Sequence, residues 1–157
     1  MTAKEQFDKD RLLTSIQKCR THLLRLQYAA NQIKRLFPLT SDKYIALTDA
    51  NIGNIDQLIF RFTKLQDELV NNTFRFLLEY LIEDIEGKPF RDILNILERL
   101  KIIDSSNTWL SLRELRNDLT HEYPMMIDET VDKLNHLFLQ LPLLENILIT
   151  IEQKTNE

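Results

Sequence analysis

Residues 12–37, LLTSIQKCRTHLLRLQYAANQIKRLF, decide the fold class of this chain. Their apolar side chains recur at alternating spacings of four and three residues, which keeps one apolar seam on a single face of an α-helix. Pro38 follows and ends the helix, because the residue before a proline is pushed out of the α region. The stretch predicts a long helix that packs in a bundle through Leu12, Ile16, Cys19, Leu23, Leu26, Ala30, Ile33 and Phe37.

A second helical stretch is expected from about Tyr44 to Ile85, with Ser41-Asp42 as its N-cap and a loosened turn near Gly53. It is long for a helix of a globular protein, and its C-terminal half is apolar on more than one side. Core burial and contact with a second subunit both remain open for the apolar residues off its seam, which are Phe60, Phe74, Leu78 and Ile82.

Three more helices are expected in the second half of the chain. Gly87-Lys88-Pro89 ends the long helix, and the proline opens a short one through Leu100. The stretch 104–107 offers several N-caps for a fourth helix, and Asp128 is expected to cap a fifth that Pro142 kinks. The fourth helix is expected to bury Trp109, Leu112, Leu115 and Leu119.

Composition supports a nearly all-helical chain. The 157 residues include only two glycines and four prolines, so the turn residues that sheets need are missing. This length suits one domain around a single core. We therefore expect residues 1–157 to form one all-α domain, an antiparallel up-and-down bundle of four main helices plus a short additional helix.

Cysteine content and hydropathy bear on the compartment. Cys19 is the only cysteine, which excludes an intramolecular disulfide and cysteine-rich zinc sites; on the apolar seam it is expected to be a small buried hydrophobe rather than a nucleophile. The N-terminus lacks an apolar signal region, and no apolar run is expected to approach the length of a membrane span. We expect a cytoplasmic protein with no membrane partner.

The charge is unevenly distributed along the chain. The formal net charge of −4 argues against a general nucleic-acid binder, yet residues 1–37 carry eight of the 20 basic residues and only three of the 24 acidic ones. Only the first helix offers a basic stripe. Unless that helix borders the functional site, the favoured interpretation is that its basic residues form an ordinary solvated face. These residues are Lys18, Arg20, Arg25, Lys34 and Arg35.

The stretch RNDLTHEYP, residues 116–124, is where side chains suited to catalysis gather. Arg116 and His121 lie roughly 140° apart around an ideal helix, but the long arginine stem can swing toward the histidine. Asn117 is nearly stacked on His121, and Tyr123 precedes a proline and should be leaving the helix. The end of the fourth helix can therefore gather all four groups.

These four side chains suit cleavage of RNA by its own 2′-hydroxyl. Histidine moves protons near neutral pH, and arginine holds the charge of a phosphorane through two parallel hydrogen bonds, so this chemistry requires neither a metal nor a cofactor. If His121 lies in the last helical turn, the helix dipole favours its protonated form. One such histidine per chain is too few for paired acid and base roles, so we expect two copies to meet across a two-fold axis.

The pattern R-x4-H-x-Y, formed by Arg116, His121 and Tyr123 with Asn117 in register, resembles the signature of the HEPN superfamily. Residues 55–81 look like the long second helix of its HepT-like branch, although residues 63–66 depart from the usual acidic and aromatic pattern. The resemblance implies a dimeric, metal-independent ribonuclease toxin. It also implies a small nucleotidyltransferase antitoxin, encoded beside it, that attaches AMP to Tyr123.

The sequence is compatible with two functions. The first is an endoribonuclease in which His121 transfers protons, Arg116 holds the phosphate and Asn117 orients either of them, acting as a homodimer or higher even oligomer. The second is a non-catalytic helical partner or substrate-binding subunit of a nucleotidyltransferase, which the acidic net charge favours. His22 and His136 lack metal-ligand spacing and are expected to be surface or partly packed residues.

Overall fold

The computed structural model describes residues 1–121 and 126–156, and helices account for 82% of these residues with no strand among them. The expectation of an all-helical chain is confirmed. In chain order the elements are α1 (Ala3–Ile33), the 3-10 turn η1 (Lys34–Leu36), α2 (Ser41–Ile45), α3 (Asp49–Glu68), the π-helical turn η2 (Leu69–Thr73), α4 (Phe74–Tyr80), α5 (Phe90–Arg99), α6 (Ser106–Thr120) and α7 (Ile127–Thr155).

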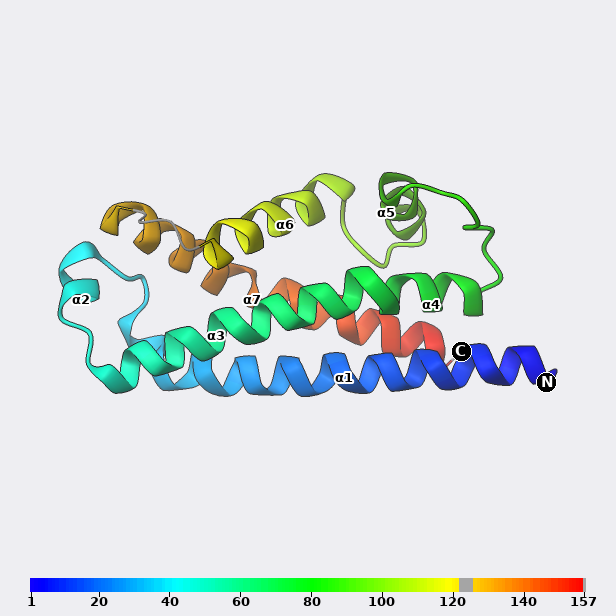
Figure 1. The fold of residues 1–157 in the computed structure, drawn as a ribbon, viewed down its shortest axis with the longest axis horizontal. Helices are drawn as coiled ribbons and strands as arrows, with labels where there is room; N and C mark the ends of the chain where they lie inside the picture. Colours follow the sequence, from blue (N-terminus) through cyan, green and yellow to red (C-terminus); the bar gives the residue numbers. More distant parts are fainter. Residues whose placement is uncertain (122–125, 157) are drawn as a thin grey trace.

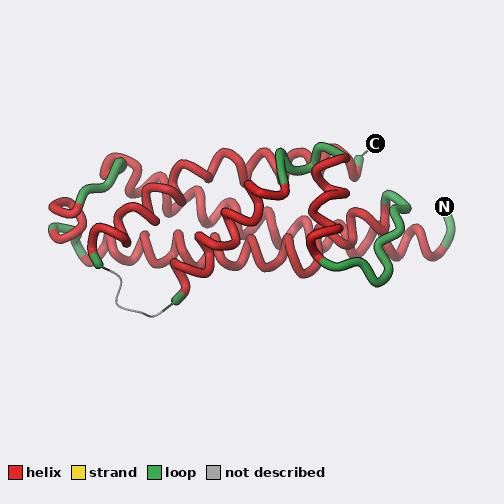
Figure 2. The backbone as a smooth tube through the Cα atoms, turned by 90° about the horizontal axis from the view of Figure 1, so that it is seen from above, coloured by secondary structure: helices red, strands yellow, loops and turns green. Residues whose placement is uncertain are grey.

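The helices form an elongated molecule with both chain ends at the same end (Figures 1 and 2). α1 runs along most of its length, with α3 and α4 beside it and its most extensive contacts to α3. α6 packs on α3 and α7, and α5 lies across one end against α4 and α6. Buried apolar side chains of α1, α3, α4, α5, α6 and α7 form one cluster.

The apolar seam of α1 is buried as expected. Its members from Leu12 to Ile33 are at most 7% exposed. A capping box begins the helix, because the Thr2 hydroxyl accepts from the Glu5 backbone N–H and the Glu5 carboxylate accepts from the Thr2 N–H. Phe37, expected on the same seam, is half-buried and its ring stacks on Phe138 with centroids 4.0 Å apart.

The start of the second helical stretch differs from the expectation. α2 is a separate five-residue helix capped by the Thr40 hydroxyl, not by Ser41-Asp42. α3 begins at Asp49, where the Thr48 hydroxyl accepts from the Asn51 N–H at 3.2 Å. α3 then passes through Gly53 without a break, because packing of its apolar face outweighs the cost of about 1 kcal/mol for a helical glycine.

The end of that stretch also differs. The helix stops at Tyr80 rather than Ile85, because Ile82 adopts a left-handed backbone with φ 61° and the Glu83 N–H donates back to the Leu78 carbonyl at 2.9 Å. Before that, η2 inserts a π-helical turn between α3 and α4. Of the residues expected off the seam, Phe74 and Leu78 are fully buried in the chain's own core, whereas Phe60 and Ile82 are exposed.

The remaining caps are partly as expected. Ser105 caps α6 by accepting from the Thr108 N–H at 3.0 Å. Pro89 is the residue before α5 and not its first residue. Met126 precedes α7, and Asp128 lies in the first turn, where its carboxylate accepts from Ser41 instead of capping the helix. α7 continues through Pro142 as one element.

α7 corrects the expectation that no apolar run reaches the length of a membrane span. By length and composition alone it is long and apolar enough to cross a membrane, with a mean hydropathy of 1.3 in a window of which 33% is buried. A core helix of a folded domain meets the same criterion, so this finding favours neither location. The buried residues of α7 are Val131, Leu134, Leu137, Leu144, Ile147, Leu148, Ile151 and Thr155.

The left-handed Ile82 generates a stability prediction. A β-branched side chain is strained at φ 61°, and Ile82 is 87% exposed, so its side chain contributes little burial. Ile82→Gly should raise the free energy of unfolding by about 1 kcal/mol, which is measured from the urea midpoint. Ile82→Ala is the matched control, because it removes the same side chain and keeps the strain; equal gains from both variants would contradict this explanation.

Candidate functional site

α6 is fixed on α3 by an apolar stripe and one buried hydrogen bond. Trp109, Leu112 and Leu115 are at most 2% exposed, and Trp109 meets the Phe74 ring edge to face at 5.0 Å. The buried Gln66 side chain donates from Nε2 to the Leu112 carbonyl at 3.0 Å. These contacts set the rotation of α6 about its axis, and therefore the direction in which its last turn presents Arg116 and Asn117.

The guanidinium of Arg116 bridges α3 and the last turn of α6. Its Nη2 lies 3.1 Å from Asp67 Oδ2, and its Nη1 donates to Asn117 Oδ1 at 3.3 Å and to Thr120 Oγ1 at 3.5 Å. The expected proximity of Arg116 and Asn117 is therefore present in the structure. Both side chains of the Asp67 ion pair are partly exposed, so its contribution to stability is below about 1 kcal/mol.

Asp67 is a site residue that the sequence did not reveal. It lies 49 positions before Arg116, and nothing in the local spacing of either helix signals the contact. Asp67 lies within residues 55–81, but the sequence pattern of that stretch indicated no individual site residue. A carboxylate beside Arg116 lowers the local positive potential, and it also holds the guanidinium in one orientation.

His121 is the residue at which α6 ends. It is the C-cap, with φ −73° and ψ 134°, and its backbone N–H donates to the Asn117 carbonyl at 3.2 Å. Its side chain is exposed. The histidine therefore lies one residue beyond the last residue of α6, Thr120, and not within the last helical turn. Tyr123, the fourth member of the predicted set, lies outside the described residues.

Other charged groups surround this helix end. Lys133 of α7 pairs with Asp118 at 2.9 Å, and this hydrogen bond raises the pKa of the Lys133 ammonium. Arg113 lies one turn before Arg116, but its guanidinium is over the Phe90 ring of α5 at 5.7 Å. The described part of the site therefore offers one fixed guanidinium, an amide and an exposed imidazole, which together can bind a phosphate and move a proton.

The described residues contain no group of three His, Cys, Asp or Glu side chains arranged to hold a metal ion. The acidic run near the end of α4 is occupied by contacts within the protein. Arg99 pairs with Glu83 at 3.1 Å, and Asp84 accepts from the Glu86 backbone N–H at 3.3 Å.

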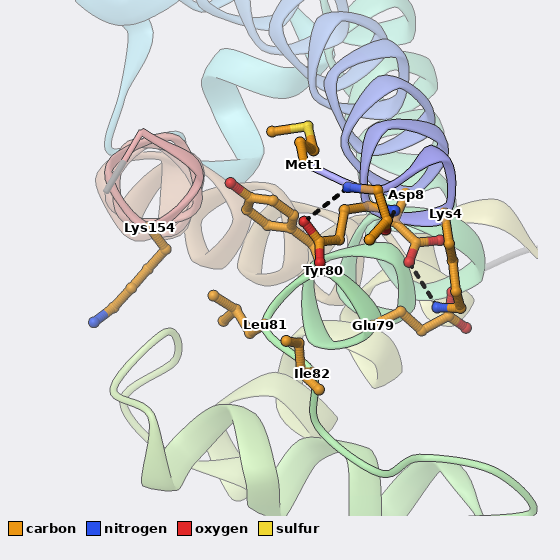
Figure 3. A pocket seen from close by; sticks show the side chains of 10 residues that line it. Met1, Lys4, Asp8, Glu79, Tyr80, Leu81, Ile82 and Lys154 are labelled. Atoms are coloured by element: carbon orange, nitrogen blue, oxygen red, sulfur yellow. Dashed lines mark hydrogen bonds and ion pairs between the residues drawn. The ribbon is translucent and has the colours of Figure 1, made fainter.

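A hollow of about 560 Å³ lies at the end of the molecule where α1 begins and α4 and α7 end (Figure 3). Tyr80 and Ile82 line it at the end of α4, Lys154 of α7 lies at its edge, and the Lys4 ammonium pairs with Asp8 at 2.9 Å. None of Arg116, Asn117 and His121 lines it. The motif and this cavity are therefore separate features.

Cys19 lies in a buried polar cluster at the π-helical turn. Its Sγ is 3.2 Å from Thr73 Oγ1, and the Ser15 hydroxyl reaches both Thr73 at 2.7 Å and the Glu68 carboxylate at 2.6 Å. Burial raises the pKa of the Cys19 thiol to about 12, with a smaller opposing effect from the Thr73 hydrogen bond. Cys19 is buried as expected, and its raised thiol pKa disfavours a nucleophilic thiolate, but its sulfur contacts a polar cluster as well as the apolar core.

Comparison with known proteins returned no match: no family model, no curated protein and no solved structure is similar enough to this chain to be significant. The functional argument therefore rests on the residues of the motif and their geometry.

The burial of Cys19 predicts an inert thiol. At pH 8 the folded protein should not react with Ellman's reagent, because the thiol is 0% exposed and the thiolate is the reactive form. Unfolding in urea should expose it, and one thiol per chain should then react within minutes. Rapid reaction in buffer that matches the rate in urea would show that Cys19 is accessible in the folded protein.

Proposed function

We propose that this chain is a HEPN-type, metal-independent endoribonuclease that acts as a homodimer or higher even oligomer in the cytoplasm. One observation carries the proposal. The guanidinium of Arg116 is held in place, by Asp67 and by side chains of its own helix, at the same helix end where the exposed His121 begins a new backbone direction. A fixed cation and an exposed imidazole at one helix end are the groups that RNA cleavage through the 2′-hydroxyl needs.

The architecture that goes with this function is an antiparallel up-and-down bundle within a single domain, residues 1–157. Its four main helices are α1, α3 with α4, α6, and α7, and α5 is the short additional helix. Side-chain contacts support an antiparallel arrangement of α1 against α3 and α4. As the residue number rises along α1, the residue number of the contacted side chain falls: Arg11 contacts Glu79, Ser15 contacts Glu68, and His22 contacts Arg61.

In the proposed reaction the 2′-oxygen of the RNA attacks the adjacent phosphorus and the bond to the 5′-oxygen breaks. The products are a 2′,3′-cyclic phosphate and a free 5′-hydroxyl. His121 of one chain gives a proton to the leaving 5′-oxygen, and His121 of the second chain accepts the proton of the 2′-hydroxyl. Arg116 holds the charge of the phosphorane, and Asn117 orients Arg116 through the 3.3 Å hydrogen bond.

The apolar surface next to the motif supports dimerisation. Met126 and Ile127 follow the motif and are 71% and 41% exposed. An interface over the end of α6 and the start of α7 would cover these side chains and bring two copies of His121 to one cleft.

A second candidate function is a non-catalytic partner of a nucleotidyltransferase. Two observations favour it: the Asp67 carboxylate forms an ion pair with Nη2 of Arg116, and the chain has a net charge of −4. A phosphate bound to Arg116 must share the guanidinium with this carboxylate or displace it. Because the pair is partly exposed and weak, displacement by a phosphate with two hydrogen bonds is feasible.

The ribonuclease proposal predicts that the purified protein cleaves RNA in the presence of EDTA and leaves 2′,3′-cyclic phosphate ends. His121→Ala should abolish cleavage. Arg116→Lys should lose nearly as much activity as Arg116→Ala, roughly 100-fold or more, because an ammonium cannot reproduce the planar fork. Gel analysis of a labelled RNA and end-group mapping measure both outcomes.

Matched controls separate this site from a contaminant. His136→Ala removes a half-buried histidine of α7, and Arg113→Lys makes the same exchange one turn before Arg116; both should retain activity. Equal cleavage by the wild type and by His121→Ala would refute the assigned site.

The resemblance described in the sequence also implies an antitoxin that transfers AMP to this chain. We therefore predict that AMP on Tyr123 switches the ribonuclease activity off. AMP on its hydroxyl puts a bulky negative group next to His121, where the RNA phosphate must lie, and blocks substrate by sterics and repulsion. If a nucleotidyltransferase is encoded beside this chain, incubation with that enzyme and ATP should silence cleavage and add one AMP to the Tyr123 peptide, as measured by mass spectrometry. Tyr123→Phe should stay folded and active; its silencing without added mass would indicate control by tight binding instead.

A further inference from the structure

Four cations of α1 and α3 have no ion pair within the part of the chain that the structure describes. Lys18 and Arg25 lie on α1 on either side of His22, and Arg61 and Lys64 lie one turn apart on α3. The hydrogen bond between His22 and Arg61, at 3.0 Å, ties the two helices together at the centre of this set. We call the surface formed by Lys18, Arg25, Phe60, Arg61 and Lys64 the basic face.

The charge of Arg61 is held next to a neutral group. Burial first, and Arg61 second, lower the pKa of His22, so the imidazole is neutral near pH 7 and its Nδ1 accepts from Arg61 Nη1. Arg61 Nε is buried and has no hydrogen-bond partner. The half-buried Arg61 guanidinium faces a neutral base, so its positive charge is not compensated and can attract an anionic ligand. Burial of this charge costs desolvation free energy, which a carboxylate partner would offset.

Four arginines outside the basic face are paired with carboxylates. Within the described residues, Arg11, Arg20, Arg99 and Arg116 each have an acidic partner. No ion pair involves any of the four cations of the basic face among those residues. Glu68, a carboxylate that acts on His22, accepts hydrogen bonds from Ser15 and Asn72. The basic face therefore has a local excess of positive charge in an acidic chain.

Phe60 adds an exposed aromatic ring to this surface. Its side chain is 48% exposed, and the charged groups of Arg61 and Lys64 lie 5.4 Å and 5.6 Å from the centre of its ring. An exposed ring flanked by cations is the combination on which single-stranded nucleic acids stack their bases while the phosphates meet positive charge.

The basic face leads toward the motif. Phe60, Lys64 and Asp67 follow one another at spacings of one turn along the same side of α3, and Asp67 is the ion-pair partner of Arg116. A strand that crosses α3 over Phe60 and Lys64 therefore arrives next at Asp67 and Arg116.

We propose that the basic face binds the sugar–phosphate backbone of single-stranded RNA, with a base stacked on Phe60, and guides the strand across α3 to Arg116. This substrate path rests on the proposed ribonuclease function, but RNA binding by the face is tested without cleavage. Single strands are favoured over duplexes because Phe60 offers a stacking surface that only unpaired bases can use.

The test measures fluorescence anisotropy of a labelled single-stranded RNA of mixed sequence, titrated with His121→Ala protein so that no RNA is cut. Adding Lys64→Glu should weaken binding about tenfold and flatten the slope of log K against log salt by about 0.7 or more. Adding Phe60→Ala should weaken binding roughly tenfold with the salt slope unchanged, since stacking releases no counterions. Blunt duplex RNA should bind more weakly and be insensitive to Phe60→Ala.

Lys88→Glu is the matched control, because it makes the same charge change at an exposed residue between α4 and α5. It should leave binding within about twofold of the parent. Thermal melts confirm that each variant is folded, and Lys64→Gln serves as a milder variant if Lys64→Glu is not.

Equal weakening by Lys88→Glu, or unchanged binding after both Lys64 and Phe60 are substituted, overturns the inference. Stronger binding of duplex RNA overturns its single-strand part. Cleavage is assayed separately with the wild-type protein. A chain that binds RNA through this face but does not cut it refutes the ribonuclease proposal alone, whereas a chain that cuts RNA and ignores both substitutions refutes the substrate path alone.

Discussion

The packing of α1 against α3 is the interaction on which the rest of this structure depends. Each fully buried leucine or isoleucine of the α1 seam contributes about 1.5–3 kcal/mol, and together these residues fix the rotation of α3. That rotation directs Arg61 and Glu68 toward α1, and it directs Gln66 and Asp67 toward α6. The position of Arg116 is therefore a consequence of α1–α3 packing, carried across α3 by two adjacent residues.

The same arrangement reconciles an acidic chain with an anionic substrate. Arg11, Arg20 and Arg99 are paired with carboxylates of other segments, which stabilises the fold and leaves little attraction for RNA there. On the basic face, His22 replaces a carboxylate as the partner of Arg61. Net charge alone would place this protein among the poor binders of nucleic acid, but binding depends on local charge and on its distance from the site.

Sequence reasoning succeeded where one strong periodic signal dominated. The α1 seam and the buried stripe of α6 follow from spacing, and both are buried in the structure except for Phe37 and Leu119, which are half-buried. It failed at boundaries set by weaker and more local effects. Thr40 and Thr48 cap α2 and α3 with single hydroxyls, and Ile82 ends α4 in a left-handed conformation that ordinarily signals glycine.

Contacts that join distant parts of the sequence were also beyond a single sequence. The π-helical turn η2 places Thr73 against Ser15 and Cys19. Its local sequence, LVNNT, does not predict that this turn contains one residue more than an α-helical turn. Asp67 was missed for the same reason, since its role appears only when α3 and α6 are side by side. The motif itself was found because its members are close in sequence.

The central claim is that two copies of the α6 end, each with Arg116 and His121, form one catalytic site. The most direct measurement mixes wild-type chain with increasing amounts of His121→Ala chain, allows subunits to exchange, and follows RNA cleavage per wild-type chain. If both imidazoles are needed, that activity falls in proportion to the wild-type fraction, because mixed dimers are inactive. Activity per wild-type chain that stays constant at every ratio would show that one chain suffices, and would contradict the shared site.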